Sequence, residues 1–273
     1  MKKNNSVLLS TPYIIWMVVF TLIPLGVVAY YALTDPATGA FTLANIRNLN
    51  MYWGVLWQSI LYSLVSAFIC LLMGYPVAYY IAHCKATTQK ILYMLVMLPM
   101  CMSFLLRTLA WVGLLQDTGI INNILVALGL PRLQMIRTPA AVVLGMVYNY
   151  LPYMILPLYS TIVKINPRLI EAAEDLGCNS LQVFRRVTLP LSIPGILSGI
   201  TMVFVPAVST FYISQKLGGT DTVLIGDVIE RLFKQGQNQN LGAALSLVLM
   251  ALVFLCTGLM NRFGGDEEGG VIV

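Results

Sequence analysis

The sequence predicts an all-α, polytopic membrane protein with about six transmembrane helices. Of its 273 residues, 58% are apolar and only 10% are charged, and the mean hydropathy is +0.81. A soluble domain carries about a quarter charged residues, so this composition indicates a membrane protein. Long apolar runs also reach the length of about 20 residues that a helix needs to cross about 30 Å of hydrocarbon.

Six such runs follow one another, and each is predicted to form one transmembrane helix. They cover 13–33, 54–82, 91–115, 138–163, 187–215 and 241–261. Only the third contains a charged residue, Arg107. The predicted organisation is therefore a tail at 1–12, a transmembrane domain at 13–262 and a second tail at 263–273.

Two shorter features need a separate interpretation. The run "IINNILVALGLP" (120–131) has twelve residues, too few to cross the membrane, and is predicted to be an interfacial or re-entrant helix. The start, "MKKNN" before an apolar run, is similar to a secretory signal. However, the run is long, contains Pro24 and is followed by no A-x-A-like cleavage site, so we expect an uncleaved anchor.

The orientation follows from Lys and Arg, which are enriched in cytoplasmic loops. Six spans place both termini on one side. With that side inside, nine basic residues lie inside and six outside. The inner ones are Lys2, Lys3, Lys85, Lys90, Lys164, Arg168, Arg185, Arg186 and Arg262; the outer ones are Arg47, Arg132, Arg137, Lys216, Arg231 and Lys234. Both termini are predicted to be cytoplasmic.

Several kinds of chemistry have no signature in the chain. The net charge of +5 is not gathered into a basic cluster, so nucleic acid is not an expected partner. No phosphate-binding G-x-x-x-x-G-K-[ST] motif is present. His83 is the only histidine, which argues against a His-based metal site or catalytic triad. The five cysteines are scattered without C-x-x-C spacing. We expect no cofactor, no metal and no catalytic residue in this chain.

The absence of acidic residues from the spans bears on how transport would be energised. None of the six predicted spans contains Asp or Glu, whereas ion-coupled transporters commonly place a carboxylate at membrane depth. This weakens the reading as a secondary transporter without excluding it, because backbone carbonyls also bind sodium. A membrane receptor that holds a cytoplasmic signalling protein is the other alternative from a different class.

A charged loop at 164–190 interrupts this apolar chain. Asn166 is a suitable N-cap and Pro167 suits the first helical position. Glu171, Glu174 and Asp175 are predicted to lie near the positive end of the first short helix. Leu169, Ala172, Ala173 and Leu176 form its apolar face, and Gly177 provides a left-handed stop.

A second short helix is predicted to begin near Ser180. It presents Leu181, Phe184 and Val187 on one side, and Arg185 and Arg186 on the other. From physical chemistry alone, this helix–Gly–helix segment is equally consistent with a solvated loop on the inner leaflet and with a docking site for a partner.

The spacing within the loop resembles a known motif. Glu171, Ala172 and Ala173 are followed after three residues by Gly177, and after nine more by Val187, Leu189 and Pro190. This is similar to the EAA-x3-G-x9-I-x-LP motif of importer-type ABC transporter permeases, with Val187 in place of Ile. The resemblance implies that the loop, including Arg185, is a coupling helix that docks on a separate ATPase subunit.

Further stretches resemble the permease subunits of spermidine/putrescine importers: "GYPVAYYIA" (74–82), "YLPYMILPLYSTI" (150–162), "FVPAVSTFYISQKLGG" (204–219) and "LIGDVI" (224–229). With the loop, the likeness covers most of 13–262. It implies the importer-type permease fold, alternating access driven by a partner's ATP hydrolysis, and a bacterial cytoplasmic membrane location. The implied partners are a second, homologous permease subunit, an ATPase dimer that binds ATP and Mg²⁺, an extracytoplasmic substrate-binding protein and membrane lipid. Related permeases carry thiamine, ferric iron or opines, so another solute stays open.

A polyamine path is expected to offer aromatic faces for cation–π contacts. The candidates are Trp111, Tyr148, Phe211 and Tyr212, with helix packing as the alternative for each. Four acidic residues in the outer segments are expected either to attract the cation or to dock the binding protein; these are Asp117, Asp221, Asp227 and Glu230. Arg107 is expected either to extend toward the outer headgroups or to have a structural partner.

Overall fold

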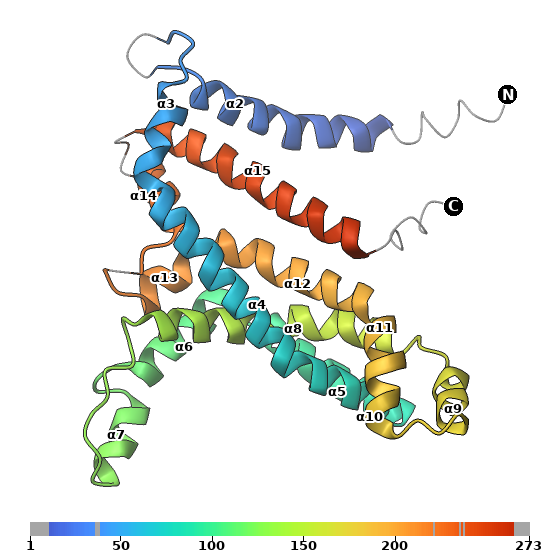
Figure 1. Cartoon of the computed structure of the whole chain (residues 1–273). Coiled ribbons are helices and arrows are strands. Elements are labelled where there is room, and N and C mark those ends of the chain that lie inside the picture. Colours follow the sequence, from blue (N-terminus) through green and yellow to red (C-terminus); the bar gives the residue numbers. More distant parts are fainter. Residues whose placement is uncertain (1–10, 36–38, 221, 235, 237, 265–273) are drawn as a thin grey trace, which may run out of the picture. The chain divides into compact units, whose positions relative to one another are not determined.

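The computed structural model describes residues 11–35, 39–220, 222–234, 236 and 238–264 of the chain. Within these residues every regular element is helical (Figure 1), and the one extended pairing is an isolated bridge between Thr34 and Phe41. The prediction of an all-α protein is confirmed.

The elements begin with a helix at Thr11–Ala32, which contains the π-helical turn η1 (Val18–Leu22) and α2 (Ile23–Ala32). Next come α3 (Ala44–Arg47), η2 (Asn48–Tyr52), α4 (Trp53–Ala82), α5 (Ala86–Met97), η3 (Leu98–Cys101), α6 (Phe104–Leu115), α7 (Ile120–Ala127) and α8 (Pro139–Ile162). The chain continues with α9 (Pro167–Asp175), α10 (Ser180–Val183), η4 (Phe184–Thr188), α11 (Leu189–Leu191), α12 (Ile193–Val208), α13 (Tyr212–Leu217), α14 (Ile225–Lys234) and α15 (Gln239–Gly264).

The described residues contain five helices that are long and apolar enough to cross a membrane, and six with one bent pair. The five are Thr11–Ala32, Ala44–Ala82, Phe104–Ala127, Pro139–Ile162 and Gln239–Met260; the bent pair is Ser180–Leu191 with Ile193–Val208. This agrees with about six spans, and the runs at 13–33, 54–82, 138–163 and 241–261 each match one helix.

The third predicted span is wrong as a continuous helix over 91–115. Helix α5 stops at Met97, a short 3-10 turn contains Pro99, and Met102 is extended before α6 begins at Phe104. Pro99 has no N–H to continue the helical hydrogen-bond ladder. The membrane-length stretch instead begins at Phe104 and extends through α7. The separate short helix expected in 120–131 is present as α7; its interfacial or re-entrant position stays a prediction.

The fifth predicted span, 187–215, is also broken. The chain bends by 61° between α11 and α12, and α12 ends at Val208 before α13 restarts at Tyr212. Prolines lie at Pro190, Pro194 and Pro206, and each removes a backbone donor from the ladder. A count of apolar residues contains no information about such breaks.

The described chain forms two compact units, which we treat separately. Unit 1 comprises residues 1–54 and 228–253, and unit 2 comprises 55–227 and 254–273. The prediction of one domain over 13–262 stays a prediction. In unit 1, the side chains of the Thr11–Ala32 helix are largely exposed, among them Tyr13, Trp16 and Phe20. Such an apolar, unpacked helix is suited to lipid or to another membrane helix.

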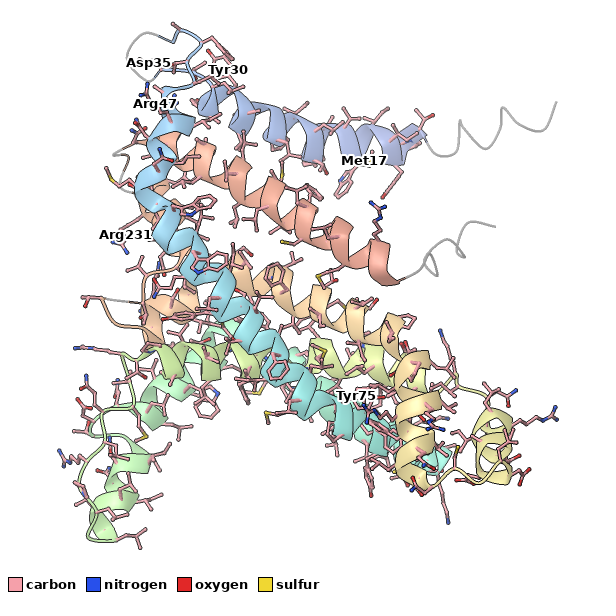
Figure 2. The ribbon with its side chains drawn as sticks, viewed as in Figure 1. Met17, Tyr30, Asp35, Arg47, Tyr75 and Arg231 are labelled. Atoms are coloured by element: carbon pink, nitrogen blue, oxygen red, sulfur yellow. The ribbon has the colours of Figure 1, made fainter. Side chains whose placement is uncertain are left out.

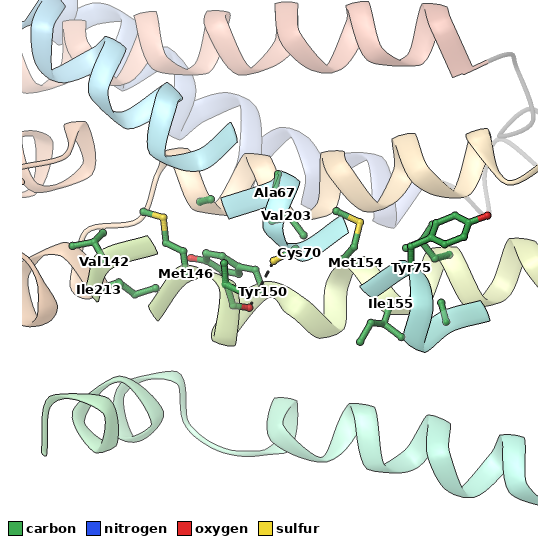
Figure 3. Packing of buried hydrophobic residues seen from close by; sticks show 14 of the residues in the cluster. Ala67, Cys70, Tyr75, Val142, Met146, Tyr150, Met154, Ile155, Val203 and Ile213 are labelled. Carbon is green, nitrogen blue, oxygen red and sulfur yellow. Dashed lines mark hydrogen bonds between the residues drawn. The ribbon is translucent and has the colours of Figure 1, made fainter. Parts of the chain in front are cut away.

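Helix α8 is the centre of unit 2. Its Met146, Met154 and Leu158 side chains are fully buried, and α12 packs along it (Figure 3). The contact is close because α12 has glycines there: a Cβ added to Gly199 would lie 2.6 Å from the Met154 sulfur. Small residues let helix backbones approach each other in membrane proteins. The loop at 164–190 connects these two packed helices, α8 and α12.

Candidate functional site

The loop at 164–190, which we call the coupling loop, begins as predicted. Asn166 caps α9, because its side-chain oxygen accepts a hydrogen bond from the Arg168 backbone N–H at 3.1 Å. Pro167 takes the first helical position, where a missing N–H has no cost. The start of this helix is therefore encoded locally.

The end of α9 depends on Gly177. Its φ is +83°, the left-handed conformation that the sequence predicts. The Gly177 N–H donates to the Glu174 carbonyl at 2.8 Å and the Cys178 N–H donates to Ala173 at 3.1 Å, so the last carbonyls of the helix are satisfied. A side chain at this φ would cost roughly 1 kcal/mol or more.

The acidic residues of α9 correct one expectation. Glu174 and Asp175 lie in its last turn, and none of the acidic residues lies in the first turn. They are therefore near the negative end of the helix dipole, where they gain nothing from it. Glu171 and Ala172 are exposed while Ala173 is buried, so the first residue of the EAA triplet is available to a partner.

The second helix starts at Ser180 as predicted, and a capping box that was not predicted precedes it. The Asn179 side chain accepts from the Gln182 N–H at 2.9 Å, and the Gln182 side chain accepts from the Asn179 N–H at 2.9 Å. Asn-x-x-Gln is the sequence signal for such a capping box. Arg185 and Arg186 are exposed, and Pro190 marks the exposed end of the loop.

Phe184 joins the coupling loop to α4. It opens the π-helical turn η4, a rare geometry that is often found at functional sites. Its ring packs edge-on against Tyr75 at 5.6 Å and Tyr79 at 5.8 Å between centroids. The Tyr75 hydroxyl is also hydrogen-bonded to Ser192 at 2.9 Å, at the bend between α11 and α12. Both tyrosines belong to the stretch 74–82, and no local pattern in the sequence indicates their contact with Phe184.

Three leucines of the coupling loop are left uncovered. Leu169, Leu176 and Leu181 have exposed fractions of 48%, 86% and 73%. The sequence predicts the first two on the apolar face of the first helix and the third on that of the second. In this chain, that surface is not packed, so it is free to meet a partner.

The four aromatic candidates for a path all lie in unit 2 and are brought together only in part. The rings of Trp111 and Tyr148 are in contact at 5.3 Å between centroids. The Tyr212 ring lies 6.2 Å from Phe104 and carries the Lys216 ammonium at 5.8 Å. Phe211 is 41% exposed, at the break between α12 and α13. Their role in transport stays a prediction.

Arg107 lies on α6, the helix that carries Trp111, and is only 7% exposed. Its Nε and Nη1 atoms are buried without a hydrogen-bond acceptor in the described part of the chain. A side chain that extended to the outer headgroups would be exposed, so the structure does not support that alternative. A buried, unpaired guanidinium is costly and indicates that its acceptor comes from outside this chain or from another conformation.

The acidic candidates differ strongly in environment. Asp117 is exposed. Asp227 is 2% exposed and accepts a hydrogen bond from the Leu224 N–H at 3.1 Å, so it caps α14 and does not fit an exposed position at a pore mouth. Glu230 forms an ion pair with Lys234. Asp221 lies outside the described residues.

Metal-ligating side chains are not clustered where the structure describes the chain: it contains no group of three or more His, Cys, Asp or Glu residues that could hold an ion.

Comparisons with known proteins show the family to which the chain belongs. Residues 71–264 match the family model described as "Binding-protein-dependent transport system inner membrane component". The chain is 39% identical over 263 residues to the spermidine/putrescine transport system permease protein PotB of Haemophilus influenzae, covering 90% of this chain and 92% of the relative. It is 36% identical to PotB of Escherichia coli, covering 88% and 90%.

Solved structures show the same fold. A bacterial ABC transporter for import of the acidic polysaccharide alginate superposes with a TM-score of 0.76 at 21% identity, covering 96% of both chains. The MetNI methionine ABC transporter in an inward-facing conformation gives 0.62 at 19% identity, covering 79% of this chain and 96% of that one. This multi-pass chain belongs to the family of binding-protein-dependent transport system inner membrane components.

Proposed function

We propose that this chain is the transmembrane permease subunit of an ATP-driven importer for polyamines of the spermidine/putrescine class. The family makes it a transport subunit. The substrate class rests on two relatives named as spermidine/putrescine permeases at 39% and 36% identity over about nine tenths of the chain.

The proposed mechanism rests on one observation: the coupling loop consists of two capped short helices whose leucine side chains are exposed. Two short helices are fixed by Asn166, Gly177 and Asn179, while Leu176 and Leu181 are exposed. A preorganised apolar surface is suited to docking, because little conformational entropy is lost on binding. The partner is an ATPase subunit, which binds ATP and Mg²⁺ and performs the hydrolysis. This chain holds no cofactor of its own.

Movement at that interface reaches the membrane through Phe184. Its ring is packed against Tyr75 and Tyr79 of α4, and Tyr75 is tied to Ser192 at the bend. A shift of the loop therefore moves α4 and the bent pair α11–α12 together. A second, homologous permease subunit completes the pore, and an extracytoplasmic binding protein delivers the substrate.

The path itself consists of aromatic surfaces rather than buried carboxylates. Trp111, Tyr148, Phe211 and Tyr212 supply cation–π contacts of roughly 0.5–2 kcal/mol each, which are weak enough to release the cation. With both termini cytoplasmic, an inside-negative potential of 100 mV favours inward movement by about 2.3 kcal/mol per charge, or roughly 7 for a trication. ATP hydrolysis then serves mainly to open and reset the gate.

The test is uptake by the complete transporter in proteoliposomes. Radiolabelled spermidine should accumulate only with ATP and the binding protein, and unlabelled putrescine should compete while thiamine, ferric iron and an opine do not. Competition by one of the latter three, without any by putrescine, would reject the polyamine assignment. Purification of the chain without a stoichiometric ATPase would instead favour a receptor or a secondary transporter.

A further inference from the structure

The end of helix α4 is capped by a side chain of the next helix. The last carbonyls of a helix have no partner within the helix itself, and a left-handed glycine often provides the stop. The six residues that follow Ala82 include no glycine. The carbonyls of Ala82 and of Cys84, in the turn after α4, instead accept hydrogen bonds from Nε2 of Gln89 at 2.8 Å and 3.0 Å. A residue of α5 therefore completes the end of α4.

The same side chain also reaches α8. Its Oε1 atom accepts a hydrogen bond from the Tyr159 hydroxyl at 3.5 Å, which is long and therefore weak. A firmer contact lies beside it, because the Tyr159 ring packs against Tyr93 of α5 at 5.4 Å between centroids. Gln89 is half-buried. Three helices, α4, α5 and α8, thus meet at this one amide.

Both ends of the coupling loop make contact with this region. Tyr159 lies in the last turn of α8, directly before the loop. Near the other end of the loop, the Phe184 ring packs on Tyr75 and Tyr79 of α4, and Figure 2 shows Tyr75 beside the segment α10–α11. The loop therefore touches α4 directly through Phe184, and it reaches the end of α4 a second time through Tyr159 and Gln89.

The two routes converge on the turn between α4 and α5. The His83 ring lies 4.2 Å from the Tyr79 ring between centroids, and its Nδ1 atom is 2.8 Å from the Tyr79 carbonyl. Tyr79 thus lies between Phe184 and the turn. From the opposite direction, Gln89 holds the carbonyls on both sides of His83. Movement of either end of the coupling loop is therefore passed to the same short turn.

The two kinds of contact differ in what they transmit. Ring packing resists approach but tolerates sliding, whereas hydrogen bonds to carbonyls fix direction as well as distance. Packed side chains and hydrogen bonds that join rigid elements carry coupling between distant sites. Without the Gln89 amide, the turn keeps its contact with Tyr79, but α5 and α8 lose their hydrogen bonds to it. Helix α4 would then follow the loop while α5 lags behind.

We propose that Gln89 is a positioning residue for energy coupling: it caps α4 from α5 and contacts Tyr159, so that α4 and α5 follow the coupling loop as one body. The inference rests on the proposed function, in which the loop receives the movement of an ATPase. Gln89 lies outside the coupling loop and outside the candidate substrate path. Its loss should therefore reduce the spermidine imported per ATP, and leave the affinity for the ATPase and for the loaded binding protein unchanged.

The experiment measures radiolabelled spermidine uptake and ATP hydrolysis in the same proteoliposomes, with the complete transporter and a titration of binding protein. Gln89→Leu removes the amide with little change in volume. It should lower maximal uptake about fivefold at an unchanged rate of hydrolysis, so that about fivefold more ATP is used per spermidine. The binding-protein concentration for half-maximal uptake should not change. Thr88→Leu places the same side chain at the neighbouring, exposed position of α5 and is the matched control, with the normal ratio.

Two further variants test the hydrogen bonds themselves. Gln89→Lys keeps N–H donors for the two carbonyls at the C-terminal end of α4, where a cation is also favoured. It should bring the ATP used per spermidine to within about twofold of the unchanged transporter. Gln89→Glu offers acceptors only when it is ionised, and should be impaired at least as much as Gln89→Leu. A loss of packing alone would affect the lysine and glutamate variants alike.

The proposal is overturned if Gln89→Leu keeps the normal ratio of ATP to spermidine. It is equally overturned if uptake falls only in proportion to the yield of complex or to the amount of bound ATPase, since either result defines a purely structural role. Equal impairment of Gln89→Lys and Gln89→Glu also contradicts it, and this pair decides the question if Gln89→Leu does not assemble. The proposed function fails separately, if the unchanged transporter imports no polyamine; the ratio for each variant is then measured with the solute that it does import.

Discussion

The coupling loop and the region around Arg107 both belong to unit 2, yet their charged side chains lie in opposite environments. In the coupling loop, Glu171, Arg185 and Arg186 are exposed and the backbone is satisfied by local caps. On α6, Arg107 is buried and two of its donors have no acceptor in the described chain. The helix ends of the loop are satisfied by its own residues and its exposed leucines offer a surface, whereas two donors of Arg107 need an acceptor from another state or another subunit.

The largest expected effect is at the stop of the first loop helix. Gly177→Val forces a β-branched side chain to a φ of +83° and should reduce ATP-dependent uptake by more than tenfold, because the two loop helices lose their relative orientation. Insertion into the membrane should be unchanged. The measurement is uptake per permease together with substrate-stimulated ATPase activity.

Gly129→Val is the matched control for this variant. Gly129 has a φ of +77° and, like Gly177, has no atom within 4 Å of an added Cβ. The backbone cost is therefore comparable, but Gly129 lies outside the coupling loop. Equal loss of transport in both variants, or normal transport in Gly177→Val, would contradict the assignment of this glycine to coupling.

The second effect concerns the contact between the loop and α4. Phe184→Ala removes the ring that packs on Tyr75 and Tyr79, and should lower uptake about tenfold while the ATPase subunit stays bound. Leu181→Ala removes an exposed side chain and should instead weaken ATPase binding. Quantifying the co-purified ATPase beside its hydrolysis rate separates the two. If Phe184→Ala loses the ATPase as Leu181→Ala does, the ring is part of the docking surface and not of the transmission.

Substitution of Arg107 should have a smaller effect, stabilising the isolated chain but impairing the assembled transporter. Arg107→Gln removes a buried, unpaired charge, and so should raise the melting temperature of the isolated chain in detergent. In the assembled transporter it should lower assembly or turnover several-fold and leave substrate affinity unchanged. Thermal unfolding, complex yield and uptake kinetics report these separately. Unchanged stability, yield and turnover together would mean that the guanidinium reaches solvent or headgroups in the membrane.

The smallest expected effect is on the aromatic path. Tyr212→Ala should reduce polyamine uptake by about threefold, since one cation–π contact contributes roughly 0.5–2 kcal/mol, and Tyr212→Phe should retain uptake because the ring is the acting group. Lys216 already lies over this ring at 5.8 Å, so the substrate has to displace a cation. Equal loss in both variants would indicate a hydrogen bond of the hydroxyl, and full uptake in both would remove Tyr212 from the path.

These two regions also differ in how far the sequence predicts them. The N-cap at Asn166, the start of the second helix near Ser180 and the left-handed Gly177 follow from local rules, and the structure confirms them. Four of the six spans have nearly the predicted bounds. Local periodicity gave no reason to place the breaks near Pro99 and Ser209, because both depend on how prolines and neighbouring helices share backbone hydrogen bonds.

Long-range contacts are the second feature that the sequence alone does not predict. The packing of Phe184 on Tyr75 joins residues more than one hundred positions apart, as does the tie between Thr34 and Asn240. Neither contact has a spacing signal in a single sequence. The burial of Arg107 and Asp227 could not be predicted either. Residue type and hydropathy indicated charges near the membrane, but the exposure of each side chain depends on how α6 and α14 pack.

The most direct test of the account is a photo-crosslinking residue at position 181, in place of the exposed Leu181 of the coupling loop, in membranes that contain the complete transporter. The account predicts a covalent product with the ATPase subunit, and none from the same residue at the exposed position 128 after α7. Capture of phospholipid alone at position 181, in a transporter that imports normally, would contradict the claim that this loop receives the force of ATP hydrolysis.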